Sequence, residues 1–133
     1  MSLLKILDVS SSAVMAEGQR LNIVASNLAN AESVAGPDGQ AYKARAAVFQ
    51  TRPGAVGQAG VRVADVIEDQ TPAARNYDPS HPMADGEGYV TQSNVNVIEE
   101  MVNMISASRS YQNNIEVMNT AQQLMLKTLA MGQ

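Results

Sequence analysis

Both ends of this chain carry apolar residues at helical spacing, whereas the stretch between them is interrupted by glycine and proline. Near the start, an apolar residue recurs at every seventh position, at Leu7, Val14, Leu21 and Leu28. A companion position of the same repeat is occupied by Leu3, Val24 and Ala31, but also by Ser10 and Glu17. This pattern predicts an imperfect amphipathic helix at the N-terminal end.

The stripe near the C-terminus is more regular. It alternates steps of four and three residues through Val97, Met101, Met104, Ser108, Tyr111, Ile115, Met118, Gln122, Met125 and Leu129. Ser108 and Gln122 are its polar exceptions. The alternation predicts a second long helix with one continuous packing face, on which the methionines supply adaptable packing rather than a cofactor site.

The residues at both ends of the second stripe agree with a helix. Asn96 precedes the stripe and Glu99 follows three residues later, an arrangement close to a capping box. We therefore expect the helix to begin near Val97 and to end at residue 130 or 131. Gly132 is expected to adopt the left-handed conformation that commonly follows a helix. At about 1.5 Å per residue, such a helix is about 50 Å long.

The middle of the chain predicts β-structure and loops. Residues 42–51 and the alternating residues 61–67 are typical of two strands, and the proline and glycines of residues 52–60 predict a turn between them. A two-stranded hairpin is marginal in water, so it needs another surface to pack on. Residues 35–39 predict a turn that ends the first helical region. Residues 71–88 contain Pro72, Pro79 and Pro82, which disfavour helix and central strand and predict an extended connector.

Composition excludes several classes of protein. The 133 residues include one Phe, four Tyr and no Trp, so any core is aliphatic and rich in methionine. A net charge of -4, without clustered Lys and Arg, argues against nucleic-acid binding. The absence of cysteine excludes disulfides, thiolate catalysis and cysteine-type zinc sites. No apolar run approaches the length that spans a bilayer, and the first residues predict no cleaved secretory signal.

No arrangement of residues predicts catalysis, a cofactor or a metal ion. Asp78, His81, Asp85 and Glu87 are chemically suited to a metal, but their spacing matches no calcium loop or zinc signature. We therefore interpret them as a solvated acidic loop. Glu99 and its neighbour Glu100 fit the start of a helix better than acid-base catalysis. We expect a protein that is not an enzyme; an enzyme with a site around His81 is the weakest alternative.

The two helical segments are poor in charge. Between Val9 and Ala31 the charged residues are Glu17 and Arg20, and between Met101 and Leu126 they are Arg109 and Glu116. Uncharged amides and hydroxyls can be covered by a neighbouring helix at lower cost than unpaired charges. The apolar stripes of one helix pair also offer too little buried surface to offset the ordering of so many residues. We infer that the helices complete their packing on neighbouring chains.

The sequence also resembles a known family. The run from Leu21 to Asn30, LNIVASNLAN, is similar to the N-terminal signature of bacterial flagellar axial proteins of the rod and hook group, with Asn-Leu-Ala-Asn as its specific core. Further similarity, to the C-type proximal rod proteins, lies in GPDGQAY from Gly36, GYV from Gly88, NVN from Asn94, EM at residues 100–101, ASRSYQNN from Ala107 and LKTL from Leu126. The similarity covers nearly the whole chain. Ser93 departs from it, because the family pattern usually has proline before Asn-Val-Asn.

The resemblance implies a structural subunit of the proximal rod of the flagellar basal body. Such a subunit crosses the type III export apparatus unfolded, without a cleaved signal peptide, and its terminal helices build a hollow periplasmic shaft that transmits torque and conducts exported subunits. The implied partners are other rod proteins, the adaptor between the rod and the MS ring, and the export apparatus, in a helical hetero-oligomer without direct membrane insertion. The alternative is a self-contained helical-hairpin adaptor that binds a single partner.

Together these observations predict a mainly α fold in which long N- and C-terminal helices pack as an antiparallel coiled coil, with a small β-hairpin and an extended connector between them. We expect the N-terminal helix in residues 1–34, the outer hairpin and connector in residues 35–95, and the C-terminal helix in residues 96–133. The residues predicted to pack subunits together are Leu21, Asn22, Asn27, Leu28, Asn30, Met104, Tyr111, Asn113, Asn114, Ile115, Met118 and Met125.

Overall fold

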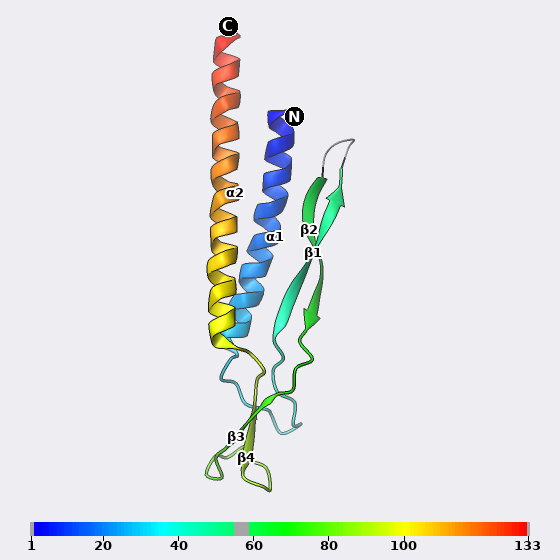
Figure 1. The fold of residues 1–133 in the computed structure, drawn as a ribbon, viewed down its shortest axis with the longest axis vertical. Coiled ribbons are helices and arrows are strands. Elements are labelled where there is room, and N and C mark those ends of the chain that lie inside the picture. The colour runs from blue at the N-terminus through cyan, green and yellow to red at the C-terminus, as the bar shows by residue number, and fades with distance from the viewer. Residues whose placement is uncertain (1, 55–58, 133) are drawn as a thin grey trace.

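Two long helices lie side by side and run in opposite directions along the molecule (Figure 1). The computed structural model describes residues 2–54 and 59–132. Helix α1 spans Leu3–Ala29 and helix α2 spans Val97–Met131, which extends beyond the N-terminal end of α1. The predicted pair of terminal helices with a small β-structure between them is thus confirmed, whereas their supercoiling into a coiled coil stays a prediction.

The start of α2 is capped as the sequence predicts. Asn96 has extended backbone angles, and its side-chain oxygen accepts hydrogen bonds from the N–H groups of Ile98 and Glu99. The prediction for the other end is wrong, because Gly132 has a φ of -89° rather than a left-handed conformation. Its N–H donates to the carbonyl of Leu129, which closes the last turn without a positive φ.

Helix α1 ends at Ala29, earlier than the predicted boundary at residue 34. Asn30 stops it: its N–H donates to the carbonyls of Ser26 and Asn27, and its side-chain Nδ2 donates to the Ser26 carbonyl at 2.9 Å. A side chain that bonds to nearby backbone in this way competes with further helical turns. The predicted turn follows later, where the Gly39 N–H donates to the Gly36 carbonyl and Gly39 adopts a φ of 73°.

The first hairpin packs along α1, on the side away from α2 (Figure 1). Strands β1 (Arg45–Pro53) and β2 (Ala59–Glu68) pair antiparallel, and the register shifts between Val48 and Phe49, opposite Ala64 of β2. The predicted hairpin is confirmed, although part of its predicted loop, residues 55–58, lies outside the described residues. The hairpin is held to α1 at Ser12, whose hydroxyl accepts a hydrogen bond from the Val61 N–H at 3.0 Å.

A second hairpin replaces part of the predicted connector. Strand β3 (Ala74–Tyr77) pairs antiparallel with β4 (Tyr89–Gln92) beyond the lower end of the helices. The predicted connector is expected to lack helix and central strand, and β3 is a strand of a two-stranded sheet. The prolines flank β3 rather than interrupt it, so every residue of β3 keeps its N–H donor. A T-shaped contact between Tyr77 and Tyr89 adds a cross-strand aromatic pair.

The core is small and lies mainly between α1 and its two neighbours. Val24 and Ala16 are buried on α1, and Ala107 and Ala121 are buried on α2. Both predicted interruptions of the α1 stripe are covered: Ser10 is buried and Glu17 is half-buried, in an ion pair with Arg20 at 3.6 Å. Among the described residues, no helix combines the length and the apolar character needed to cross a membrane.

Candidate assembly surface and the Asn27 junction

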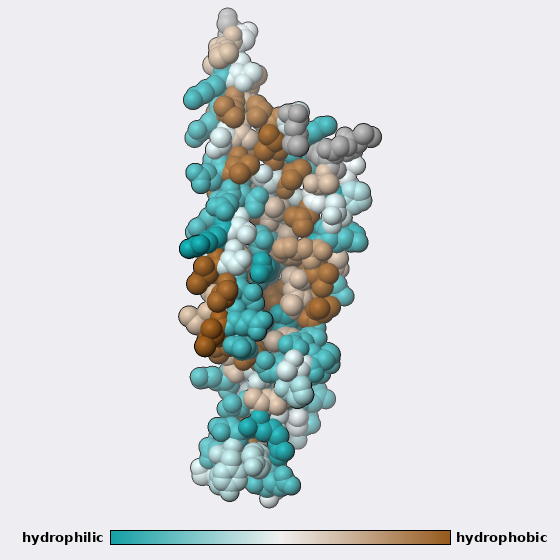
Figure 2. Space-filling view, viewed as in Figure 1, coloured by the Kyte–Doolittle hydropathy of each residue, from teal (hydrophilic) through white to brown (hydrophobic). Residues whose placement is uncertain are grey.

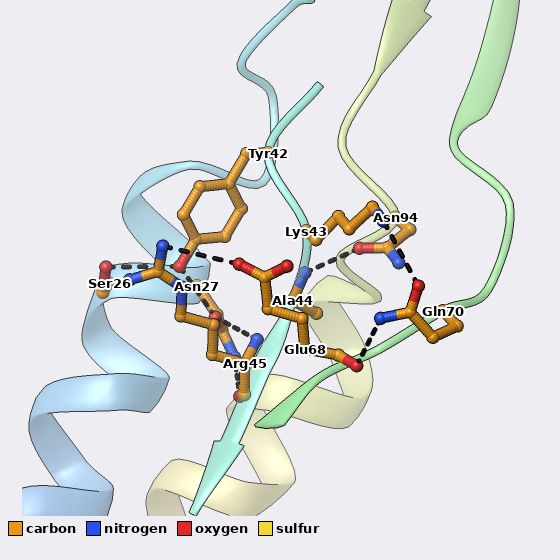
Figure 3. Close-up of polar contacts among 9 residues, drawn as sticks. All are labelled: Ser26, Asn27, Tyr42, Lys43, Ala44, Arg45, Glu68, Gln70 and Asn94. Carbon is orange, nitrogen blue, oxygen red and sulfur yellow. Dashed lines mark hydrogen bonds and ion pairs between the residues drawn. The ribbon is translucent and has the colours of Figure 1, made fainter. Parts of the chain in front are cut away.

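Asn27 lies at the point where α1, α2 and the first hairpin meet (Figure 3), and its side chain is fully buried. Its Oδ1 accepts hydrogen bonds from the N–H of Arg45 and the hydroxyl of Tyr42, both at 3.0 Å. Its Nδ2 donates to the Arg45 carbonyl at 2.8 Å and to Glu100 Oε2 at 3.1 Å. The amide thereby uses both of its donors and two acceptor positions, which is what a buried polar side chain requires.

Further polar contacts surround Asn27 and extend the junction to the base of the hairpin (Figure 3). The Arg45 guanidinium pairs with Glu68 across the two strands at 3.7 Å and lies over the Tyr42 ring. Asn94, just before α2, accepts from the Ala44 N–H at 2.7 Å. Residues from four separate parts of the sequence are therefore fastened at one end of the helix pair, which we call the Asn27 junction.

The other predicted asparagines occupy different environments. Asn22 and Asn113 are exposed. Asn30 and Asn114 donate to backbone carbonyls of their own helices, to Ser26 and Ser110 respectively. Among the described residues of this chain, Asn27 is the member of the group whose side chain bonds to the other helix, whereas the role of all five in packing between subunits stays a prediction.

The predicted apolar residues all lie half-buried on the helices. This group consists of Leu21, Leu28, Met104, Tyr111, Ile115, Met118 and Met125. On α2, however, the most deeply buried residues are Ala107, at 0% exposure, and Ala121, at 3%. The buried stripe follows heptad positions a and d, with Met104, Tyr111, Met118 and Met125 at a and with Ala107, Asn114 and Ala121 at d.

The predicted stripe on α2 is half-buried at position a from Met104 onward, but Val97 is exposed. At its second position, the most deeply buried residues lie at d rather than at the predicted position e. At position e, Met101 and Leu129 are exposed, whereas Ile115 is half-buried. The available signal was the repeated alanine at Ala107 and Ala121, since small residues allow two helices to approach closely. The position of Glu100 in the sequence predicts a helix-start carboxylate, and in the structure its side chain also accepts the hydrogen bond from Asn27.

Among the residues that the structure describes, α2 leaves several large apolar side chains exposed, and two groups of them form distinct surfaces. The first, which we call the Ile98 patch, lies near the start of α2 and consists of Ile98, Met101, Val102 and Ile105. The second, the Leu124 groove, is a depression of about 420 Å³ between α1 and the far part of α2. Its lining includes Leu3, Ile6, Val117, Thr120, Ala121 and Leu124. Figure 2 shows hydrophobic residues gathered both low on α2 and higher between the two helices.

The acidic loop uses its side chains to hold the second hairpin. Asp85 accepts from the N–H groups of Tyr89 and Glu87, and its second oxygen accepts from Arg75 at 2.8 Å. These donors, with the Tyr89 N–H the most important, lower the pKa of Asp85. The pKa of Asp78 is lowered mainly by the hydroxyl of Ser80. Each carboxylate thus has a structural task in a turn.

Comparison with known proteins identifies the family. Residues 7–37 match a family model described as flagella basal body rod protein, and residues 87–131 match one described as flagellar basal body rod FlgEFG protein C-terminal. The chain is 58% identical to the flagellar basal-body rod protein FlgC of Escherichia coli O6:H1 and to that of Salmonella typhimurium, in each case over the whole of both chains. The corresponding protein of Borreliella burgdorferi is 35% identical over all of this chain and 99% of its own length.

The chain belongs to the flagellar basal-body rod protein family.

This membership confirms the resemblance found in the sequence, and it makes the chain a structural rod subunit of the flagellar basal body rather than an enzyme. The two matches to rod-protein family models fall mainly on α1 and α2, so the features that define the family coincide with the terminal helices. The first match includes Asn27 and the second includes Glu100. The bond between these two side chains therefore joins the two regions that the rod-protein models recognise.

Proposed function

We propose that this rod protein is a subunit of the proximal rod, and that its terminal helices pack with those of neighbouring subunits into a hollow shaft. In this role the shaft transmits torque and conducts exported subunits. The proposal is supported by the full-length similarity to proteins named as flagellar basal-body rod proteins. It extends that similarity by naming the terminal helices as the elements that assemble.

The observation that carries the proposal is the large apolar surface that α2 leaves exposed. Ile98 is 76% exposed, Val102 is 60% exposed and Leu129 is 64% exposed. Apolar side chains gathered on one helix are typical of an interaction surface when few charges separate them. On α2, the stretch from Met101 to Leu126 carries only Arg109 and Glu116 as charged residues. A neighbouring helix can cover such a surface without burying many unpaired charges.

The proposed partners and location of the subunit follow from its role in the proximal rod. We expect the subunit to contact other flagellar rod proteins and the adaptor between the rod and the MS ring in a helical hetero-oligomer. The rod position places it in the periplasm, which it reaches through the type III export apparatus. No membrane insertion or nucleic-acid contact forms part of this role.

The chain divides accordingly into an axial and an outer part. We propose that residues 1–34 and 96–133 contribute to the axial tube and that residues 35–95 form the outer layer. The subunit-packing residues remain those predicted from the sequence. The half-buried members of this group leave part of their surface to a neighbour, as at Leu21, Leu28, Tyr111, Ile115 and Met118.

A charge on the packing face tests this function. We expect Leu28→Asp to be exported at normal levels but to block rod assembly, because a carboxylate on a covered helix face loses its hydration without a partner. Swimming in soft agar and recovery of the chain in purified basal bodies measure the result. Gln19→Asp is the matched control, since Gln19 is exposed on the same helix.

A second variant separates assembly from folding. Ile98→Asp changes a residue that is largely exposed within the chain, so the isolated protein is expected to keep its helical circular dichroism spectrum while swimming is lost. Normal swimming of both variants would contradict assembly through the terminal helices.

A further inference from the structure

The Ile98 patch and the Leu124 groove lie on opposite flanks of α2. Relative to the buried a and d positions, Ile98 and Ile105 occupy position b and Met101 occupies position e. Val117 and Leu124 occupy position g, which is on the other side of the buried stripe. The two surfaces are thus different in composition, different in shape and directed away from each other.

The Ile98 patch and the Leu124 groove also lie at different positions along the axis of α2. From Ile105 to Leu124, α2 rises by about 30 Å at 1.5 Å per residue. A surface that contacts its own counterpart on a second copy produces a closed, two-fold symmetric pair. Two unlike surfaces on opposite flanks instead allow a head-to-tail contact, which continues from copy to copy and produces an open helical series.

We propose that the Ile98 patch of one copy of this chain occupies the Leu124 groove of the next copy, with the two α2 helices parallel and offset by about 30 Å along their axes. The inference rests on the proposed function and deepens it by naming the partner and both contacting surfaces. A second copy is the occupant that covers both exposed surfaces with one repeated contact, whereas an unrelated partner on either surface leaves the other uncovered.

The chemistry of the two surfaces is compatible with this contact. The groove is lined mainly by apolar atoms, with Glu116 as its charged residue. The patch presents aliphatic and thioether side chains without a charged member, so closing the contact forces no ammonium or carboxylate of the patch into the groove. Ala121 belongs both to the groove and to the buried stripe, so the contact would continue the packing of α1 against α2.

The absence of cysteine from the sequence makes the contact directly testable by cross-linking. One strain would carry two forms of the chain with different tags, one with Ile105→Cys and the other with Leu124→Cys. Basal bodies purified from swimming cells would be treated with a short bismaleimide. We expect a mixed dimer that carries both tags as the main product, with neither Ile105→Cys nor Leu124→Cys linked to itself.

The matched control exchanges the flanks at the same heights. Ser106→Cys replaces Ile105→Cys, and Gln122→Cys replaces Leu124→Cys. Both control residues are exposed, and each lies on the flank of α2 opposite to the test residue that it replaces. This pair is therefore expected to give no mixed dimer. Self-linked dimers of Ile105→Cys, an equal yield from the control pair, or links to a different rod protein alone would each overturn the inference. The proposed function fails separately, if the tagged chains are missing from basal bodies of swimming cells.

Should the cysteine at residue 105 or 124 prevent swimming, Val102→Cys with Val117→Cys examines the same two surfaces. A mixed dimer from this pair would support the contact, and its absence from basal bodies that contain both chains would overturn it.

Discussion

The replacement of Asn27 by Asp is the sharpest test of the polar junction, because it changes the chemistry of the side chain and hardly its shape. In the structure, Nδ2 donates to the Arg45 carbonyl at 2.8 Å and to Glu100 at 3.1 Å. A carboxylate at position 27 keeps the two accepted hydrogen bonds but replaces both donated ones with contacts between oxygens. One of these contacts brings two carboxylates together.

The cost can be estimated from these contacts. Two lost hydrogen bonds contribute about 1 kcal/mol each. Repulsion between two charges about 4 Å apart contributes at most about 4 kcal/mol near a protein surface, and less here because Glu100 is only half-buried. We therefore expect Asn27→Asp to lower the free energy of unfolding by about 3 to 5 kcal/mol at pH 7. Protonation of the introduced carboxyl group removes the repulsion, so part of this loss is recovered as the pH falls towards 4.

Urea unfolding of the purified full-length chain, followed by circular dichroism at pH 7 and pH 4, measures both effects. Asn27→Ala removes all four hydrogen bonds of the side chain and adds no charge, so its loss of stability is expected to be nearly independent of pH. Asn22→Asp, at an exposed site on the same helix, is the control for adding a charge to α1. If Asn27→Asp were no more costly than Asn22→Asp, or equally costly at both pH values, the role assigned to the junction would be refuted.

Two further predictions concern the hairpins. Because the folded pKa of Asp85 is lowered, its contribution to stability is complete above the unfolded pKa and is lost as the pH falls through the folded pKa. Near-ultraviolet circular dichroism of the Tyr77 and Tyr89 pair should therefore weaken in acid, and Asp85→Asn should reduce this pH dependence. Gly60→Ala should destabilise the chain by about 1 to 2 kcal/mol in urea unfolding, since the new Cβ would lie 2.7 Å from Ser12 Oγ. An unchanged urea midpoint would show that Ser12 can move aside.

The parts of the fold with regular periodicity could be predicted from the sequence. The α1 stripe, the Asn96 cap and the first hairpin all depend on local spacing and local hydrogen bonds, and the structure confirms them. The second hairpin could not be predicted in this way, because its two strands are short and are separated by a loop rich in proline and glycine. Strand β3 is defined by pairing with residues well ahead in the chain rather than by a pattern of its own.

The Asn27 junction could be predicted only in part, because its partners are distant in the sequence. The Asn-Leu-Ala-Asn motif indicates that Asn27 matters, but the four partners of its side chain lie near residue 45 and at residue 100. Hydrophobic periodicity does not single out Ala107 and Ala121, because an alanine side chain buries little apolar surface. Their importance comes from the close approach of another helix, which periodicity alone does not report.

Helix α1 forms more side-chain hydrogen bonds with the first hairpin than with α2. Hydrogen bonds tie α1 to the first hairpin at Asp8, Ser12 and Asn27, close to both ends of the helix. Among the residues that the structure describes, the hydrogen bond between a side chain of α1 and a side chain of α2 is the one from Asn27 to Glu100, at a single end. Directional bonds thus hold α1 to the hairpin at three points, whereas apolar packing supplies most of the contact between α1 and α2. Because apolar packing has no preferred direction, the bond from Asn27 to Glu100 is the side-chain contact that can fix the alignment of the two helices along their length.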